Sequence, residues 1–143
     1  MSLESSQVQR LSSLVAAMEP KFDEIARSFF DHFSKACPAA KSLRPSMNRR
    51  ARCEFAASVA MVMKNLGRLD AASAVFEYAR QRCGDAGIRP ADMQIAGACL
   101  MSVMREAAGP NWSNQIESDC QALMRECMSR MKPAGSMPRR EAA

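Results

Sequence analysis

The strongest constraint in this sequence is a run of apolar residues between Phe22 and Phe33 that recur at steps of three and four. Its members are Phe22, Ile25, Ala26, Phe29, Phe30 and Phe33. Because an α-helix turns once about every 3.6 residues, this spacing places all of them on one helical face. Aromatic residues make up only 6% of the chain, yet they dominate this face. We therefore expect a helix whose aromatic side is buried as core.

Similar periodicity, interrupted by proline and glycine, continues along the chain. The helices that it predicts cover roughly residues 5–18, 20–36, 48–66, 70–83, 90–108 and 112–131. No segment of useful length shows the alternation of period two that is typical of a strand. The sequence thus predicts an all-α domain of about six to seven helices over residues 1–131. Residues 132–143 have the composition of a disordered basic tail.

The composition is that of a single globular domain. The chain has 143 residues, of which 48% are hydrophobic and 24% are charged. It contains neither a run of eighteen apolar residues nor a basic head followed by an apolar stretch, so we expect a cytoplasmic protein without a membrane span or signal peptide. The net charge is +5. Arg49, Arg50 and Arg52 stand together but without interleaved aromatic residues, so a nucleic-acid partner is not expected.

The cysteines and the histidine limit the chemistry that the chain can perform. There is one histidine, His32, and no C-x-x-C pair. Without a secretory signal, the cysteines are expected to be buried or reactive thiols and not a disulfide framework. A structural zinc site is not expected either. The cysteines are Cys37, Cys53, Cys83, Cys99, Cys120 and Cys127.

Three stretches, in this order and spacing, resemble the globin family, specifically the single-domain bacterial haemoglobins and the globin domain of flavohaemoglobins. They read SFFDHFSKACPAAKSLRP, VMKNLGRLDAASAVFEYARQRCGDAGIRPADM and GACLMSVMREAAGPNWS. The resemblance implies a globin-like fold that holds haem b between a distal helix, near residues 48–66, and a proximal helix, near residues 70–83. It also implies a small gaseous ligand of the oxygen type.

The resemblance also assigns the pocket residue by residue. Cys83 stands where the family has the histidine that ligates iron. Phe30 and Met93 stand where bacterial members have the distal tyrosine and the tyrosine that supports the proximal histidine. The family's wedging phenylalanine falls on Arg44, and its distal polar residue falls on Ala51. The pocket that the resemblance implies is lined by Phe30, Leu43, Ala51, Phe55, Val59, Ala79, Cys83, Ile88 and Met93.

Cys83 admits more than one role. A thiolate is a good haem ligand, and the nearby Arg80 and Arg82 favour the thiolate form, although the C-terminal end of a helix opposes it. Alternatively, Cys83 is a small buried hydrophobic residue or a redox-sensing thiol. His32 lies about 200° around the helix from Phe30 and is expected on the surface or between helices.

Two functions remain open from the sequence. The first is a haem-binding globin that senses a small ligand or performs redox chemistry, with Cys83 as axial ligand. An ordinary oxygen carrier is not expected, because the distal side offers no hydrogen-bond donor. The second is a haem-free sensor or interaction module whose pocket is filled by side chains or another apolar ligand. Leaving about 400 Å³ empty would cost roughly 10 kcal/mol, so the pocket cannot simply be vacant. A non-enzymatic protein is favoured, and a homodimer through the last two helices is compatible with either function.

Overall fold

The computed structural model describes residues 3–42 and 49–131, and over these residues the chain is built from α-helices and short 3-10 helices without a strand. This confirms the all-α prediction. The 3-10 helices lie between the α-helices, at η1 (Glu19–Lys21), η2 (Pro38–Ser42), η4 (Leu69–Ala72) and η5 (Gly109–Asn111). The α-helices are α1 (Ser5–Met18), α2 (Phe22–Ala36), α3 (Arg49–Lys64), α4 (Ser73–Asp85), α5 (Pro90–Ala108) and α6 (Asn114–Arg130). The expected tail, 132–143, lies outside the described residues.

Local chemistry accounts for the helix ends and for the errors in their prediction. Gly87, after α4, and Gly109, after α5, have φ values of +79° and +53°, a region that glycine enters without steric cost. α6 begins two residues later than expected, because the Ser113 hydroxyl accepts the Ile116 backbone N–H at 3.1 Å and caps the helix there. Pro20 was expected in the first turn of α2 but lies in η1.

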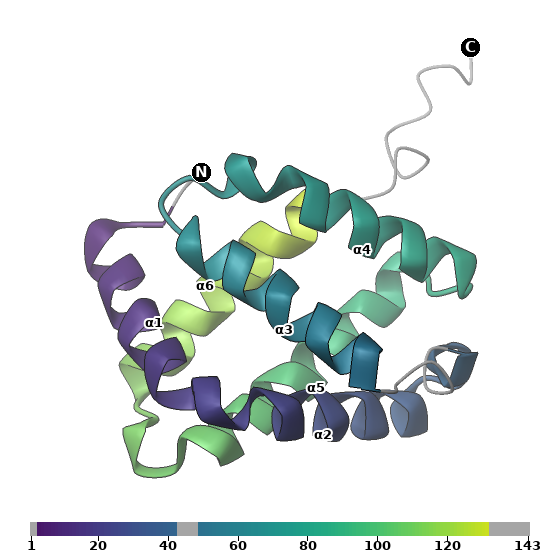
Figure 1. Cartoon of the computed structure of the whole chain (residues 1–143), viewed down its shortest axis with the longest axis horizontal. Helices are drawn as coiled ribbons and strands as arrows, with labels where there is room; N and C mark the ends of the chain where they lie inside the picture. Colours follow the sequence, from purple (N-terminus) through teal and green to yellow (C-terminus); the bar gives the residue numbers. More distant parts are fainter. Residues whose placement is uncertain (1–2, 43–48, 132–143) are drawn as a thin grey trace.

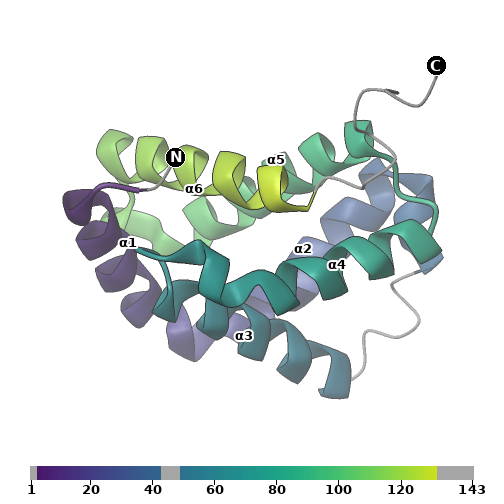
Figure 2. The same ribbon diagram turned by 90° about the horizontal axis from the view of Figure 1, so that it is seen from above.

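The helices form two layers that α1 and α2 join. Viewed from above, α5 and α6 lie along one side of the molecule, and α3 and α4 lie along the other (Figure 2). α2 runs along the lower edge of Figure 1 and packs against both α3 and α5. α1 packs against α5 and α6. No helix of the described residues is long and apolar enough to cross a membrane.

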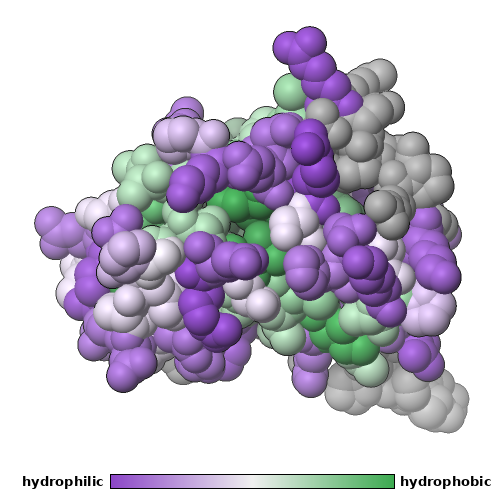
Figure 3. Space-filling view, turned by 90° about the horizontal axis from the view of Figure 1, so that it is seen from below, coloured by the Kyte–Doolittle hydropathy of each residue, from purple (hydrophilic) through white to green (hydrophobic). Residues whose placement is uncertain are grey.

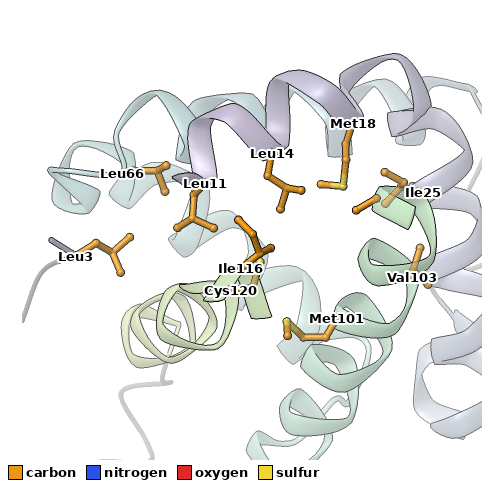
Figure 4. Close-up of a cluster of buried hydrophobic side chains, with 11 residues drawn as sticks. Leu3, Leu11, Leu14, Met18, Ile25, Leu66, Met101, Val103, Ile116 and Cys120 are labelled. Atoms are coloured by element: carbon orange, nitrogen blue, oxygen red, sulfur yellow. The ribbon is translucent and has the colours of Figure 1, made fainter. Parts of the chain in front are cut away.

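The largest buried cluster, called here the α1 core, joins α1 to the second half of α5 and the first half of α6 (Figure 4). Leu11, at 1% exposure, is among its most deeply buried members. An ion pair ties the same helices together, because Arg10 Nε lies 2.6 Å from the Asp119 carboxylate, which is fully buried. The members of the α1 core are Leu3, Leu11, Leu14, Met18, Ile25, Leu66, Met101, Val103, Ala108, Ile116 and Cys120.

Candidate functional site

Four of the nine predicted pocket residues meet in a second apolar cluster, away from the α1 core. This cluster, called here the α2–α5 cluster, has the buried members Phe29, Phe33, Cys37, Ala40 and Ile88. Phe30, Cys83 and Met93 pack against it as half-buried side chains. The phenylalanine face of α2 is thus core, as its periodicity predicts. The structure brings Phe30 of α2 together with Cys83 of α4 and Met93 of α5, which follow it by 53 and 63 positions in the sequence.

The other predicted pocket residues do not join this cluster. Val59 on α3 and Ala79 on α4 are half-buried and belong to none of the buried clusters. Leu43 lies outside the described residues, and so do the side chains of Ala51 and Phe55. Their predicted places in the pocket therefore stay predictions.

α4 is fixed at both ends, and this places Cys83. Near its start, Phe76 is buried with Leu69 and Ala72 against the second half of α6. Cys83 comes seven residues after Phe76, which is close to two turns, so both lie on the same face of the helix. At the end of α4, the Cys83 carbonyl oxygen accepts the backbone N–H of Ile88 at 2.9 Å. The thiol is therefore carried on a helix end that is pinned to the α2–α5 cluster.

Around Cys83, the apolar side chains of α3, α4, the first half of α5 and the second half of α6 are only partly covered by the rest of the protein. None of the described side chains of α3 is buried, and Phe76 is the one buried side chain of α4. On α5, no side chain from Met93 to Leu100 is buried, and on α6 none is buried after Cys120. In a close-packed interior, apolar side chains on inward faces would be covered. This half of the molecule thus presents apolar surface that a ligand could cover.

The surface on the side of α2 is predominantly hydrophilic. Hydrophobic residues show there only in places, between the hydrophilic ones (Figure 3). This is the pattern of an amphipathic helix that turns its charged face to solvent and its aromatic face inward. The aromatic residues of α2 are therefore available to line the interior of the site.

The electrostatics of Cys83 differ from the expectation. Burial raises the pKa of its thiol, and Arg82 opposes this effect only in part. Arg80 was expected to favour the thiolate, but its guanidinium is engaged by the Glu77 carboxylate. Arg82 donates a hydrogen bond from Nη1 to the Tyr78 hydroxyl at 3.1 Å and lies over the same ring. In the structure as described, the Cys83 thiol is therefore favoured in its protonated form.

His32 is not part of this site. It is exposed on α2, and its ring Nδ1 lies 2.7 Å from the Ser28 carbonyl oxygen. That contact closes a turn within the helix on its outer side. The expectation of a surface histidine is confirmed.

Two further thiols lie in the cluster and were not singled out from the sequence. Cys37 is buried at the end of α2, and Cys99 is half-buried on α5. Burial and the nearby Cys37 both raise the pKa of Cys99. Cys37 follows Phe33 by four residues, so the same helical periodicity that identified the aromatic face could have found it.

The start of α5 is held by an ion pair beside the cluster. The Asp92 carboxylate accepts the Arg89 backbone N–H at 3.0 Å and also binds the Arg89 guanidinium. These bonds lower the pKa of Asp92, so the carboxylate stays charged although it is buried. The pair fixes the turn that leads from Cys83 into α5.

The donor set suits a metal that brings most of its own ligands. Among the described residues, no group of three or more histidine, cysteine, aspartate or glutamate side chains could hold a metal ion. A haem iron has four ring nitrogens and needs only an axial ligand from the protein, which a cysteine thiolate can supply. The half-buried apolar side chains beside Cys83, among them Phe30 and Met93, are of the kind that contact the faces of a porphyrin ring. The residues present thus fit haem better than a bare metal ion.

One cavity lies elsewhere, between α1 and the segment that enters α6. It has a volume of about 450 Å³ and opens widely to solvent. Arg10 forms part of its wall, but its guanidinium is already engaged by Asp119. The lining consists of Gln9, Arg10, Ser13, Leu14, Ala17, Asn111 and Ile116. None of the predicted pocket residues belongs to it.

Comparison with known families gives one result. A family model described as Globin matches residues 21–131, which extends from η1 through the last residue described after α6. No curated protein and no solved structure matches the chain.

Proposed function

Because the chain belongs to the globin family, whose members usually bind haem, we propose that it holds haem between α3 and α4 with the Cys83 thiolate as axial ligand. The observation that carries this proposal is the position of Cys83. It stands at the pinned end of α4 and packs against the same cluster as Phe30, Ile88 and Met93. It therefore faces the half of the molecule in which apolar side chains are incompletely covered.

The chain's own residues would perform three tasks around the group. Cys83 would hold the group through its deprotonated sulfur, and bound haem would supply iron chemistry of the kind that a thiolate ligand supports. The apolar walls of α3 and α4 exclude water from the ring faces. Because the Ile88 N–H binds the Cys83 carbonyl oxygen, the main chain that carries the Cys83 side chain is held in place.

The distal side favours a ligand that needs no hydrogen bond. Phe30, which the family resemblance assigns to the distal side, is half-buried and meets Phe29 edge to face, with ring centroids 4.8 Å apart. Bound oxygen carries partial negative charge and gains from a nearby donor, whereas a hydrocarbon ring supplies none. We therefore propose sensing or redox chemistry of an apolar gaseous ligand, and not oxygen carriage.

A specific observation also supports the haem-free alternative. Burial favours the neutral Cys83 thiol, which then behaves as a small hydrophobic side chain packed against Ile88 and its neighbours. In this second candidate, the protein is a globin-fold sensor or interaction module, and another apolar ligand covers the exposed walls.

A haem titration followed by absorption spectroscopy distinguishes the haem-binding proposal from the haem-free alternative. The wild-type protein is expected to give a saturable Soret band with the position of a thiolate complex, and Cys83→Ser is expected to lose that position. Cys53→Ser is the matched control, since Cys53 is exposed on α3 and its substitution is expected to leave the spectrum unchanged. No saturable band in the wild type would support the haem-free module. A band that is identical in Cys83→Ser would show that another group ligates the iron.

A further inference from the structure

The cavity between α1 and the segment that enters α6, called here the α1–α6 cavity, has an apolar floor and a polar rim. Leu14 and Ile116 are the buried members of its lining, and Leu14 extends from α1 toward Ile116 (Figure 4). The rim carries exposed hydrogen-bonding side chains, namely Gln9 and Ser13 on α1 and Asn111 before α6. The volume of about 450 Å³ and this mixture of apolar and polar groups are typical of small-molecule sites.

Arg10 is the charged member of this lining, and the described structure engages one edge of its guanidinium. Nε donates to Asp119 Oδ2 at 2.6 Å, and Nη2 donates to Asp119 Oδ1 at 3.0 Å. Because a guanidinium is a planar fork of N–H donors, this side-on pairing leaves the Nη1 donors and the second Nη2 donor pointing away from Asp119. The Arg10 side chain is 38% exposed and lines the cavity, whereas Asp119 does not. These outer donors can therefore serve a molecule that is bound there.

The Asp119 carboxylate fixes the position of Arg10 in advance. It is fully buried and also accepts a hydrogen bond from the Gln115 amide at 3.2 Å. A side chain that is already held in place loses less freedom on binding than a mobile surface arginine does. The ion pair is nearly neutral as a whole, so an anion must be held by hydrogen bonds from the outer donors.

The charges around the cavity do not oppose an anion. Among the described residues, no acidic side chain lines the cavity, and the net charge of the chain is +5, which attracts anions. Glu4, whose charge also acts on Arg10, stands before the first turn of α1 and outside the lining.

We propose that the α1–α6 cavity binds a small organic carboxylate with a short apolar body. The carboxylate oxygens accept hydrogen bonds from the outer donors of Arg10, a geometry in which a guanidinium and a carboxylate match as planar partners. The apolar body lies over Leu14 and Ile116. A ligand with both parts uses the whole lining, whereas acetate would leave the floor uncovered and a neutral molecule would leave the Arg10 donors unused. None of the residues that line this cavity belongs to the α2–α5 cluster.

Sodium benzoate is a suitable probe, because it joins a carboxylate to a small apolar ring. Since the ligand is small and the cavity is open to solvent on one side, a dissociation constant in the millimolar range is expected. Benzamide has the same ring without the charge, and sodium acetate has the charge without the ring. Each is expected to bind at least about tenfold more weakly than benzoate. Two-dimensional ¹H–¹⁵N NMR spectra of the full chain, titrated at constant ionic strength, measure the affinities and locate the site through the amides of Ser13, Ala17 and Asn111.

Ser13→Glu tests the site without removing a buried contact. Ser13 is exposed and follows Arg10 by three residues, so the two side chains are neighbours on the helix surface. The new carboxylate is expected to take the outer donors of Arg10 and to weaken benzoate binding at least about tenfold. The matched control is Ser12→Glu, which adds the same charge at an exposed position outside the lining. Because salt screens a charge that does not touch the ligand, the control is expected to change the affinity less than about twofold.

Three results would overturn the proposal. Benzoate that does not saturate the wild type by about 20 mM has no site of the expected affinity. Benzamide that binds as tightly as benzoate shows that the Arg10 donors do not hold the ligand. Equal weakening by both variants, or shifts confined to amides away from the cavity, shows that benzoate binds elsewhere.

A second variant keeps the test decisive if circular dichroism shows that Ser13→Glu is unfolded. Ala17→Phe then takes its place, because Ala17 is exposed on the lining and the larger ring would cover the floor. It too is expected to weaken benzoate binding at least about tenfold. The protein is measured without added haem, so the outcome does not depend on the proposed function.

Discussion

The α1 core and the region around α3 and α4 are packed in different ways. In the α1 core, buried side chains follow one another at nearly every turn, as at Leu11, Leu14 and Met18. In α3, none of the described side chains is buried, and α4 buries only Phe76. Both regions have apolar inward faces, so composition alone does not explain the difference.

Two helices take part in both regions and show where the packing changes. The inward side chains of α5 are half-buried from Met93 through Leu100 and become buried at Met101 and Val103. α6 changes in the opposite direction along the chain, from the buried Cys120 to the half-buried Leu123. The same helices thus run from a tightly packed scaffold into the walls of the candidate site. We infer that the scaffold stabilises the fold, whereas the region around α3 and α4 is left to be completed by a ligand.

The largest expected effect tests the scaffold. Leu11→Ala removes a side chain that is 1% exposed, and it is expected to lower the free energy of unfolding by about 3–4 kcal/mol. Urea unfolding followed by circular dichroism measures this change. A loss below about 1 kcal/mol would mean that the α1 core relaxes around cavities and is not a rigid scaffold.

Haem binding should stabilise the protein through the region around α3 and α4. Haem at about a hundred times its dissociation constant is expected to add about 2.7 kcal/mol to the free energy of unfolding. The same concentration is expected to stabilise Cys83→Ser less, because the axial bond is lost. Urea midpoints with and without haem give both values. Equal midpoints in the wild type would remove the support for a ligand that completes this region.

The ion pair between Arg10 on α1 and Asp119 on α6 is expected to make the free energy of unfolding depend on pH. The hydrogen bond from Arg10 lowers the pKa of Asp119 below its ordinary value of 3.8. The unfolded chain therefore takes up this proton first as the pH falls. The stabilisation is complete well above pH 3.8 and is lost as the pH falls from there through the lowered value.

Urea unfolding of the wild type and of Asp119→Asn between about pH 3 and pH 7 tests this sign. Near neutral pH, the free energy of unfolding of the wild type is expected to exceed that of Asp119→Asn. This difference is expected to shrink as the pH falls. Glu77→Gln is the control for an exposed ion pair, since exposed pairs contribute little. An advantage that is constant across the range would show that the stability contributed by Asp119 does not depend on its charge.

The smallest effect is expected at the wall of the candidate site. Val59→Ala removes two methyl groups from a half-buried side chain, so the free energy of unfolding without haem should fall by less than about 1 kcal/mol. With haem bound, the same substitution should cost more, because the ligand would then cover Val59. Haem-free and haem-loaded unfolding curves provide the comparison. An equal cost in both states would show that Val59 does not meet the ligand.

The sequence predicted the scaffold better than the site, for a physical reason. Helical periodicity records which face is buried, so the aromatic core face of α2 followed from spacing alone. Periodicity does not record which distant helix a residue meets. The neighbours of Cys83 came from the family resemblance, and the engagement of Arg80 by Glu77 went unnoticed. The burial that raises the pKa of Cys83 depends on packing between helices, which no local pattern contains.

Hydrogen exchange of backbone amides, read by mass spectrometry with and without haem, tests the comparison most directly. Without haem, amides of α1 and of the first half of α6 should exchange slowly, and amides of α3 and α4 should exchange fast. Haem is expected to slow exchange in α3 and α4 and to leave α1 nearly unchanged. If the amides of α3 and α4 are already as protected as those of α1 without a ligand, the region around α3 and α4 does not need a ligand to complete its packing. The inferred difference between that region and the α1 core is then wrong.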